Sequence, residues 1–130
     1  VYFPAHARCE DFSVAAPHLQ VWFMHEMTHV WQYQRGFSVL KSGVILTCVG
    51  GYRHARAYQY LQAACSQIKP FHLLNMEQQA EVVAHYFAAK HLRFKQYQSR
   101  LPLLEQCLQP FLAHPTWLGL LPNHSRCSQK

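Results

Sequence analysis

The chain has 130 residues, half of them apolar, which suits one domain with a single hydrophobic core and excludes a disordered tail. Twelve Lys and Arg against six acids give a net charge of +6, but these bases are scattered, so no nucleic-acid-binding protein is indicated. No apolar run of about 18 residues is present, so no membrane span is expected. Because neither an initiator Met nor a signal peptide is visible, we interpret residues 1–130 as one domain, a C-terminal fragment of a longer protein.

The first half of the chain predicts one well-defined helix. Apolar residues recur at three- and four-residue spacing over residues 18–35, and Gly36 follows as a stop signal. Residues 1–17 are expected to be irregular, with a short extended piece at their start. Residues 37–51 carry β-branched and aromatic side chains and end in two glycines, which favours an extended segment or hairpin. A further helix is expected around residues 54–66.

The second half predicts two more helices. Asn75 can cap a helix that continues to about Gln98, with its acids early and its bases late, as the helix dipole favours. A third helical piece covers roughly residues 101–113. The tail from His114 is expected to be a loop that packs through Trp117 and its leucines. The predicted fold class is therefore mainly α, with a short extended or hairpin segment.

The five cysteines do not form any Cys-x-x-Cys pair, which excludes a zinc ribbon and a thioredoxin-type redox motif. We expect reduced, mostly buried thiols. A disulfide between Cys107 and Cys127 is the alternative in an oxidising compartment.

The strongest motif is His-Glu-Met-Thr-His, which begins at His25 and ends at His29, inside the best-defined helix. The i, i+4 spacing places both imidazoles on one helix face, where they can bind one metal ion, and imidazole suits zinc. Glu26 lies beside the metal and is expected to be the general base. A catalytic zinc needs a third protein ligand. Gln32 and Arg35 replace the Gly and His of the metzincin motif, which excludes that class.

Acidic residues that could supply the third ligand are scarce. After the motif the chain contains only Glu77, Glu81 and Glu105. We favour Glu77 as the ligand over Glu81, one helical turn later, and the acid that does not bind the metal can accept a hydrogen bond from a liganding imidazole. His85, another turn along the same face, is an alternative ligand. The competing interpretation is that both acids form a solvated first turn of the helix.

The remaining candidate residues are interpreted from their position in the sequence and their spacing. Four residues between the two metal helices are candidates for stabilising an oxyanion: Tyr52, His54, Tyr58 and Tyr60. Histidines without ligand spacing are interpreted as structural or surface groups: His6, His18, His72, His91, His114 and His124.

Two strings resemble a known family. FMHEMTHVWQYQ at residues 23–34 resembles the metal helix of small zinc metallopeptidase domains at the C-termini of type VI secretion VgrG spike proteins and in Rhs-associated toxins. NMEQQAEVV at residues 75–83 resembles the second motif of that family. Residues 11–13 and 58–60 also match, so the resemblance spans roughly residues 2–90.

The resemblance implies a gluzincin-like domain with one zinc ion per chain, Glu77 as the third ligand and Glu81 as its neighbour. It also implies an antibacterial effector that is secreted as part of its parent spike protein, acts in the periplasm of a target cell and has a cognate immunity protein as a partner. In many relatives an acid stands at the position of His85, so the role of that residue stays open.

The function predicted is a zinc metallopeptidase that cleaves a peptide bond in a protein or in cell-wall cross-links, and the basic surface favours the cell wall. One alternative is a catalytically inert, zinc-containing binding module of a secreted spike protein. A nucleic-acid-binding domain is the other, but it would need clustered bases with stacking aromatics, which the sequence lacks.

Overall fold

The computed structural model describes residues 3–48, 58–62 and 67–122. The helices and strands are α1 Pro17–Gln34, α2 Val39–Cys48, β1 Leu61–Gln62, β2 Gln67–Ile68, α3 Met76–Lys90, α4 Lys95–Gln98 and α5 Leu101–Ala113. Short 3-10 helices are η1 Ala5–Ala7, η2 Phe12–Val14, η4 Phe71–Leu73 and η5 Leu118–Leu120. The predicted mainly α class is confirmed for this part of the chain. No helix within it is long and apolar enough to cross a membrane.

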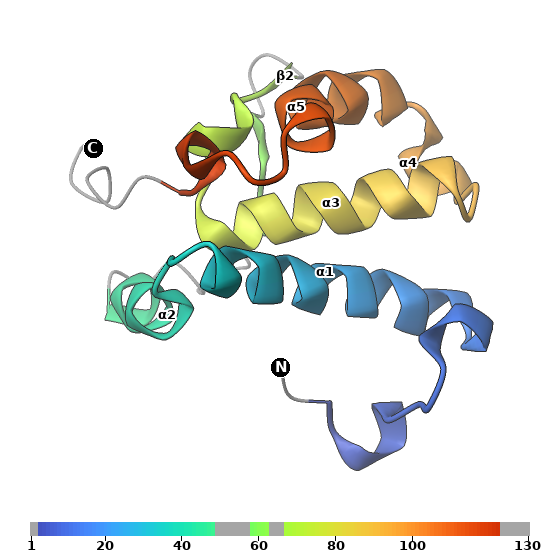
Figure 1. Cartoon of the computed structure of the whole chain (residues 1–130). Coiled ribbons are helices and arrows are strands. Elements are labelled where there is room, and N and C mark those ends of the chain that lie inside the picture. Colours follow the sequence, from blue (N-terminus) through green and yellow to red (C-terminus); the bar gives the residue numbers. More distant parts are fainter. Residues whose placement is uncertain (1–2, 49–57, 63–66, 123–130) are drawn as a thin grey trace.

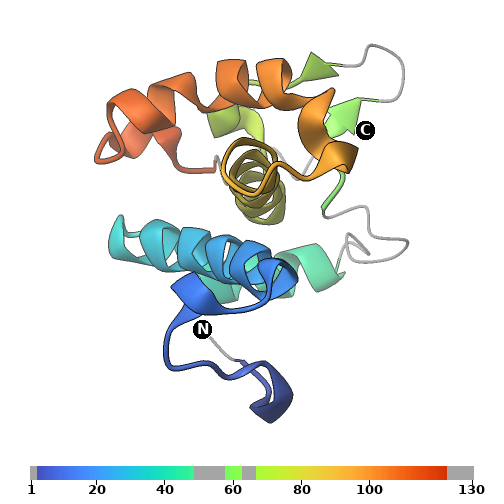
Figure 2. The ribbon, with the colours of Figure 1, turned by 90° about the vertical axis from the view of Figure 1, so that its right-hand side faces the viewer.

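Helix α3 lies in the middle of the molecule and is covered on two sides. Helix α1 runs beside it in the opposite direction, and α5 packs on the other side (Figure 1). The view along α3 in Figure 2 shows α1 on one side of it and α5 on the other. The hairpin of β1 and β2 contacts α5, and its register pairs Leu61 with Ile68. These two interfaces determine which side chains of α3 are buried.

Helix α1 has nearly the bounds predicted from the periodicity over residues 18–35. Pro17 suits its first turn, where a backbone N–H would have no intrahelical partner. At the other end Gly36 has a φ of +92°, and the N–H of Phe37 donates to the carbonyl of Gln32 at 2.9 Å. This left-handed stop is typical of glycine, so the prediction at Gly36 is confirmed.

The N-terminal segment packs on α1 through aromatic rings. The ring of Phe12 stacks on that of Phe23 with centroids 4.6 Å apart, and Phe3 lies 5.5 Å from Trp22. Asp11 accepts a hydrogen bond from the backbone N–H two residues later at 2.9 Å and caps the 3-10 helix that carries Phe12. These contacts bury part of the Trp22 ring next to the metal motif.

The predicted cap of α3 is confirmed. The side chain of Asn75 accepts a hydrogen bond from the N–H of Gln78 at 2.8 Å, and the Gln78 side chain accepts one from the N–H of Asn75 at 3.0 Å. This reciprocal pair is a capping box. It places the residue that follows Met76, the candidate ligand Glu77, in the first turn of the helix.

The predicted continuation of this helix to Gln98 is wrong, because α3 ends at Lys90 and α4 is a separate single turn. The chain reverses at Arg93, which has a φ of +56°. The N–H of Phe94 then donates to the carbonyl of Ala88 at 3.0 Å, which satisfies an acceptor at the helix end. A non-glycine residue with positive φ has no clear signal in the sequence. The prediction, which relied on the distribution of charges, therefore placed the end of the helix too late.

The extended segment predicted for residues 37–51 is also wrong, because α2 occupies most of its described part. Strand propensity measures fit to a pleated, half-buried surface and depends strongly on context. Here Phe37 and Val39 pack near Met76 at the start of α3 instead. The end of the segment lies outside the described residues.

The helix predicted around residues 54–66 is wrong where the chain is described, since Leu61–Gln62 form β1. Residues 54–57 and 63–66 lie outside the described part. The third helix, predicted over residues 101–113, is confirmed by α5.

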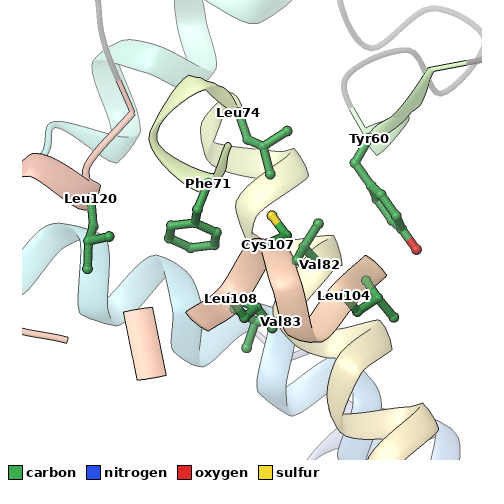
Figure 3. Close-up of a cluster of buried hydrophobic side chains, with 9 residues drawn as sticks. All are labelled: Tyr60, Phe71, Leu74, Val82, Val83, Leu104, Cys107, Leu108 and Leu120. Carbon is green, nitrogen blue, oxygen red and sulfur yellow. The ribbon is translucent and has the colours of Figure 1, made fainter. Parts of the chain in front are cut away.

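The hydrophobic core fills the space between α3 and α5, closed by η4, the hairpin and the tail (Figure 3). It consists of Tyr60, Phe71, Leu74, Val82, Val83, Leu104, Cys107, Leu108 and Leu120. Burial raises the pKa of the Cys107 thiol to about 12, so this cysteine is a neutral core group. The predicted burial of the thiol is confirmed at this position, and its reduced state stays a prediction because Cys127 lies outside the described residues.

The tail packs through Leu120 but not through Trp117. Leu120 is 1% exposed, whereas Trp117 is 58% and Leu118 63% exposed. The indole of Trp117 instead covers Gly119, where an added Cβ would lie 2.6 Å from the ring. The prediction for the leucines is therefore confirmed at Leu120 and at Leu121, which packs against Phe37 and Met76, and the prediction for Trp117 is wrong.

Candidate metal centre

Helices α1 and α3 bring three metal-ligating side chains together. The Nε2 atoms of His25 and His29 are 3.2 Å apart, and each lies 3.1 Å from Oε2 of Glu77. Together these residues form a group that can hold one metal ion. Glu77 is 7% exposed, and the side chains of His25 and His29 are 12% and 14% exposed. The antiparallel packing of α1 on α3 is what joins residues 48 and 52 positions apart in sequence.

The donor set and its spacing fit zinc. Two imidazole nitrogens and one carboxylate oxygen are a known ligand set of catalytic zinc. Ligand atoms around a tetrahedral zinc lie roughly 3.3–3.4 Å apart, given metal–ligand distances of about 2.0–2.1 Å. The three atoms here form a triangle with sides of 3.1 to 3.2 Å. Among the described residues no fourth His, Cys, Asp or Glu joins this group.

Electrostatics of the centre favour a cation. Burial disfavours the charged form of His25, but hydrogen bonds to Glu77 and Glu81 outweigh it and raise the pKa of His25 to about 9. Burial likewise favours neutral Glu81, but hydrogen bonds with His25 and His85 lower the pKa of Glu81 to about 2. Both shifts result from attraction between carboxylates and a positively charged imidazole. A divalent cation bound by neutral imidazoles would supply positive charge at the same place.

Buried glutamines support His29. Oε1 of Gln32 lies 2.9 Å from Nδ1 of His29, and the Gln32 amide donates to the Met76 carbonyl at 3.1 Å and to Oε1 of Gln79 at 3.0 Å. Gln79 in turn donates to the carbonyls of Phe71 and Leu120 at 2.9 and 2.7 Å. Both glutamines are fully buried. Because Oε1 can only accept, the proton of His29 must lie on Nδ1, which leaves Nε2 for a metal.

A carboxylate supports His25 in the same way. Nδ1 of His25 lies 2.9 Å from Oε1 of Glu81, whose other oxygen lies 3.0 Å from Nε2 of His85. The hydroxyl of Tyr60 is 2.7 Å from Nδ1 of His85. Glu81 therefore contacts the ring nitrogen of His25 that does not face Glu77, and its supporting role stays a prediction.

Glu26 borders a cleft of about 350 Å³ beside the ligands. The indole N–H of Trp22 donates to Oε1 of Glu26 at 3.2 Å, which orients the carboxylate from the same face of α1. The cleft is lined by His18, Val21, Trp22, His25, Glu26, Tyr58, Glu81 and Ala84. A larger cavity of about 560 Å³ lies between the hairpin, α5 and the tail, away from all three candidate ligands.

The four oxyanion candidates occupy different places. Tyr58 lines the cleft with its ring centroid 6.1 Å from that of His25. Burial and then the charges of nearby carboxylates raise its pKa, so its hydroxyl stays protonated. Tyr60 is 5% exposed and bonds to His85. Tyr52 and His54 lie outside the described residues.

Histidines interpreted from the sequence as surface groups are exposed wherever they are described, namely His6, His18, His72, His91 and His114. Sequence reasoning missed Trp22, Gln32 and Gln79. A signal for Gln32 existed, since it lies one turn beyond His29 on the metal face, but glutamine there has no recognised chemistry of its own.

Comparison with known proteins gives a sequence similarity. Over 95 residues the chain is 36% identical to the type VI secretion system spike protein VgrG2b of Pseudomonas aeruginosa. The similar stretch covers 70% of this chain but 9% of the length of VgrG2b. No protein-family model matches the chain, and neither does any solved structure. The similarity to VgrG proteins predicted from the sequence is therefore confirmed.

Proposed function

We propose that the chain is a gluzincin-like zinc metallopeptidase domain of a VgrG-type spike protein. The observation that carries this proposal is the convergence of His25, His29 and Glu77 within 3.2 Å beside a cleft that Glu26 borders. A structural zinc site normally has four protein ligands, whereas a catalytic site has three. A carboxylate beside the three ligands that does not itself bind the metal, as expected for Glu26, is typical of catalysis. The similarity to VgrG2b supports the proposed context of the domain.

The roles follow from position. His25, His29 and Glu77 would hold zinc, which when bound lowers the pKa of a water ligand towards 7 and polarises a carbonyl oxygen. Glu26 accepts a proton during attack on the peptide carbonyl and passes it to the leaving amine. Trp22 fixes one oxygen of that carboxylate. Tyr58 is the described candidate for donating a hydrogen bond to the developing oxyanion.

Zinc content per chain, measured by elemental analysis, tests the ligand set. The wild type should carry one zinc ion. His29→Ala and Glu77→Ala should lose it, and Glu81→Ala should lose it only in part, because Glu81 supports a ligand without being one. A wild type that takes up no zinc even after incubation with the metal would contradict the proposal.

Catalysis is tested with Glu26→Gln, which keeps the shape of the side chain and removes the base. We expect zinc content to stay unchanged and peptide-bond cleavage to fall by about 10²- to 10⁴-fold. Substrates should include unfolded proteins and cell-wall peptides, because both contain the peptide bond. If the wild type binds zinc but cleaves no peptide bond, and Glu26→Gln is equally toxic, the inert zinc-containing binding module is the correct function instead.

The last part of the proposal is that the domain is delivered as an antibacterial effector. We expect the chain to inhibit growth when exported to the periplasm of a sensitive bacterium and to be harmless when retained in its cytoplasm. The Glu26→Gln variant, produced at the same level, is the control. An immunity protein encoded with the parent spike protein should suppress the periplasmic toxicity. Equal toxicity in both compartments would contradict the site of action.

A further inference from the structure

A continuous row of hydrogen-bonding groups leads from the metal centre into the hydrophobic core. Its members are His25 on α1, Glu81 and His85 on α3, and Tyr60 next to β1. The successive distances are 2.9, 3.0 and 2.7 Å. Glu81 and His85 are separated by one helical turn, so α3 itself holds both side chains on one face.

Donors and acceptors in this row can be assigned from its ends. The Tyr60 hydroxyl lies at a nitrogen of His85, while a carboxylate, which can only accept, lies at the other nitrogen. Nε2 of His85 therefore carries a proton and donates to Glu81. Nδ1 of His85 is then the acceptor for the Tyr60 hydroxyl. Glu81 uses its second oxygen to accept from Nδ1 of His25, which leaves Nε2 of His25 with a lone pair.

Packing holds His85 and Tyr60, the two residues of the row farthest along it from His25, in place. The His85 ring stacks on Tyr97 with centroids 4.2 Å apart and planes 21° apart. Tyr60 is 5% exposed and belongs to the core cluster between α3 and α5 (Figure 3). Burial raises the pKa of Tyr60, and this keeps its hydroxyl protonated as a donor. His85 is thus held in place from three directions, by Tyr60, by Tyr97 and by Glu81.

We propose that His85 and Tyr60 are positioning residues of the metal centre, which orient the Glu81 carboxylate so that it presents Nε2 of His25 to the metal. This inference rests on the proposed function, because it assumes that a metal ion binds. It gives His85 a role other than that of a ligand. His85 is not part of the three-residue metal group and contacts Glu81, which in turn contacts His25.

The first test is the zinc dissociation constant of the full chain, measured by competition with a chelator. Outer partners of metal ligands typically contribute 10- to 100-fold to affinity. We expect His85→Phe, which keeps a ring for stacking on Tyr97, to weaken zinc binding about 10-fold. Tyr60→Phe, which removes only the hydroxyl, should weaken it by a smaller factor. Unchanged zinc affinity in His85→Phe would overturn the inference.

Transmission through Glu81 is tested with a double-mutant cycle. In a Glu81→Ala background, His85→Phe should have almost no further effect on zinc affinity, because the intermediate carboxylate is gone. An equal loss in both backgrounds would show that His85 acts without Glu81 and would overturn the inference. His85→Gln should recover most of the affinity, since its amide can replace Nε2 as the donor to Glu81.

Controls separate positioning from general damage. His91→Phe changes an exposed histidine that ends α3 and should leave zinc affinity unchanged. In the zinc-loaded wild type, imidazole ¹⁵N NMR should show His85 with its proton on Nε2 alone. A proton on Nδ1 of His85 would contradict the assignment. If the wild type binds no zinc, the proposed function and this inference fail together, whereas tight wild-type binding with unaltered variants overturns the inference alone.

Discussion

The two faces of α3 are stabilised by different physical interactions. Towards α1 the helix presents Glu77 and Glu81, which contact the imidazoles of α1, and His85 follows one turn later and contacts Glu81. Towards α5 it presents Val82 and Val83, which belong to an apolar cluster. The polar contacts with α1 depend on charge, on protonation and on whether a cation is bound, although Met24 and Trp31 of α1 also pack against the apolar cluster. The packing towards α5 depends on apolar area removed from water and is insensitive to all three.

The difference between the two faces of α3 is tested most directly by substituting one residue on each face. Leu104→Ala, in the fully buried cluster, should lower the free energy of unfolding by about 2–5 kcal/mol, with or without zinc. Glu77→Gln should weaken zinc binding by roughly 100-fold or more, because it removes the anionic ligand. Chemical denaturation with and without zinc measures both. A zinc-dependent effect of Leu104→Ala would show that the two faces are coupled.

Zinc removal should act on the α1 interface alone. Free zinc at 100 times its dissociation constant stabilises a protein that binds it only when folded by about 2.7 kcal/mol. We therefore expect a chelator to lower the melting temperature of the wild type and to leave that of Glu77→Gln almost unchanged. Hydrogen exchange should then rise first in α1 and last in α5. Uniform loss of protection in both helices would contradict the comparison.

Gln32 should contribute to the zinc affinity and to the stability of the fold, though its effect on zinc affinity should be smaller than that of a metal ligand. Gln32→Leu leaves Nδ1 of His29 and the buried amide of Gln79 each without one partner, so we expect a loss of about 1–3 kcal/mol in stability. Zinc affinity should fall about 10-fold. Gln34→Leu, an exposed position on the same helix, is the matched control and should change neither quantity.

The metal-free chain should lose stability as the pH rises. The pKa of His25 is raised in the fold from 6.5 to about 9, so its contribution is fully present below pH 6.5 and is lost as the pH rises through 9. Unfolding of the chelator-treated chain at pH 6 and pH 9.5 measures this change. His25→Gln should flatten the profile. In the presence of zinc the trend should reverse, because liganding imidazoles must be neutral.

The smallest expected effect concerns Cys107 in the apolar cluster. Because burial raises the pKa of its thiol to about 12, almost no reactive thiolate forms at pH 8. Alkylation with iodoacetamide, mapped by mass spectrometry, should leave Cys107 unmodified while the half-buried Cys9 reacts. Zinc should not alter this difference. Rapid modification of Cys107 would mean that the α5 side opens more readily than its packing indicates.

Local patterns predicted the parts of the fold that depend on local physics. Periodicity gave α1 and α5, and single residues gave the stop at Gly36 and the cap at Asn75. Elements that depend on tertiary packing were not predictable in this way. The helix α2, the positive φ at Arg93 and the pairing of Leu61 with Ile68 have no clear signal in the local pattern of the sequence.

The same difference applies to the candidate site, where contacts within one helix were predictable and contacts between elements were not. His25 and His29 were predictable because one helical turn joins them, and Glu77 because acids are scarce in the chain. The buried amide of Gln79 and the contact between Tyr60 and His85 depend on how α3 meets α1, the tail and the hairpin. Spacing within one element cannot predict such contacts between elements.

The ligands lie far apart along the chain, so a bound metal ion would also act as a cross-link. His25 and Glu77 are separated by 52 positions, and joining them closes a loop that contains α2 and the β1–β2 hairpin. The entropic cost of closing a flexible loop grows only with the logarithm of its length, by about 0.6 kcal/mol for each doubling. Insertions in that connection would therefore cost little, and a chain with a longer connection could still form the same metal centre.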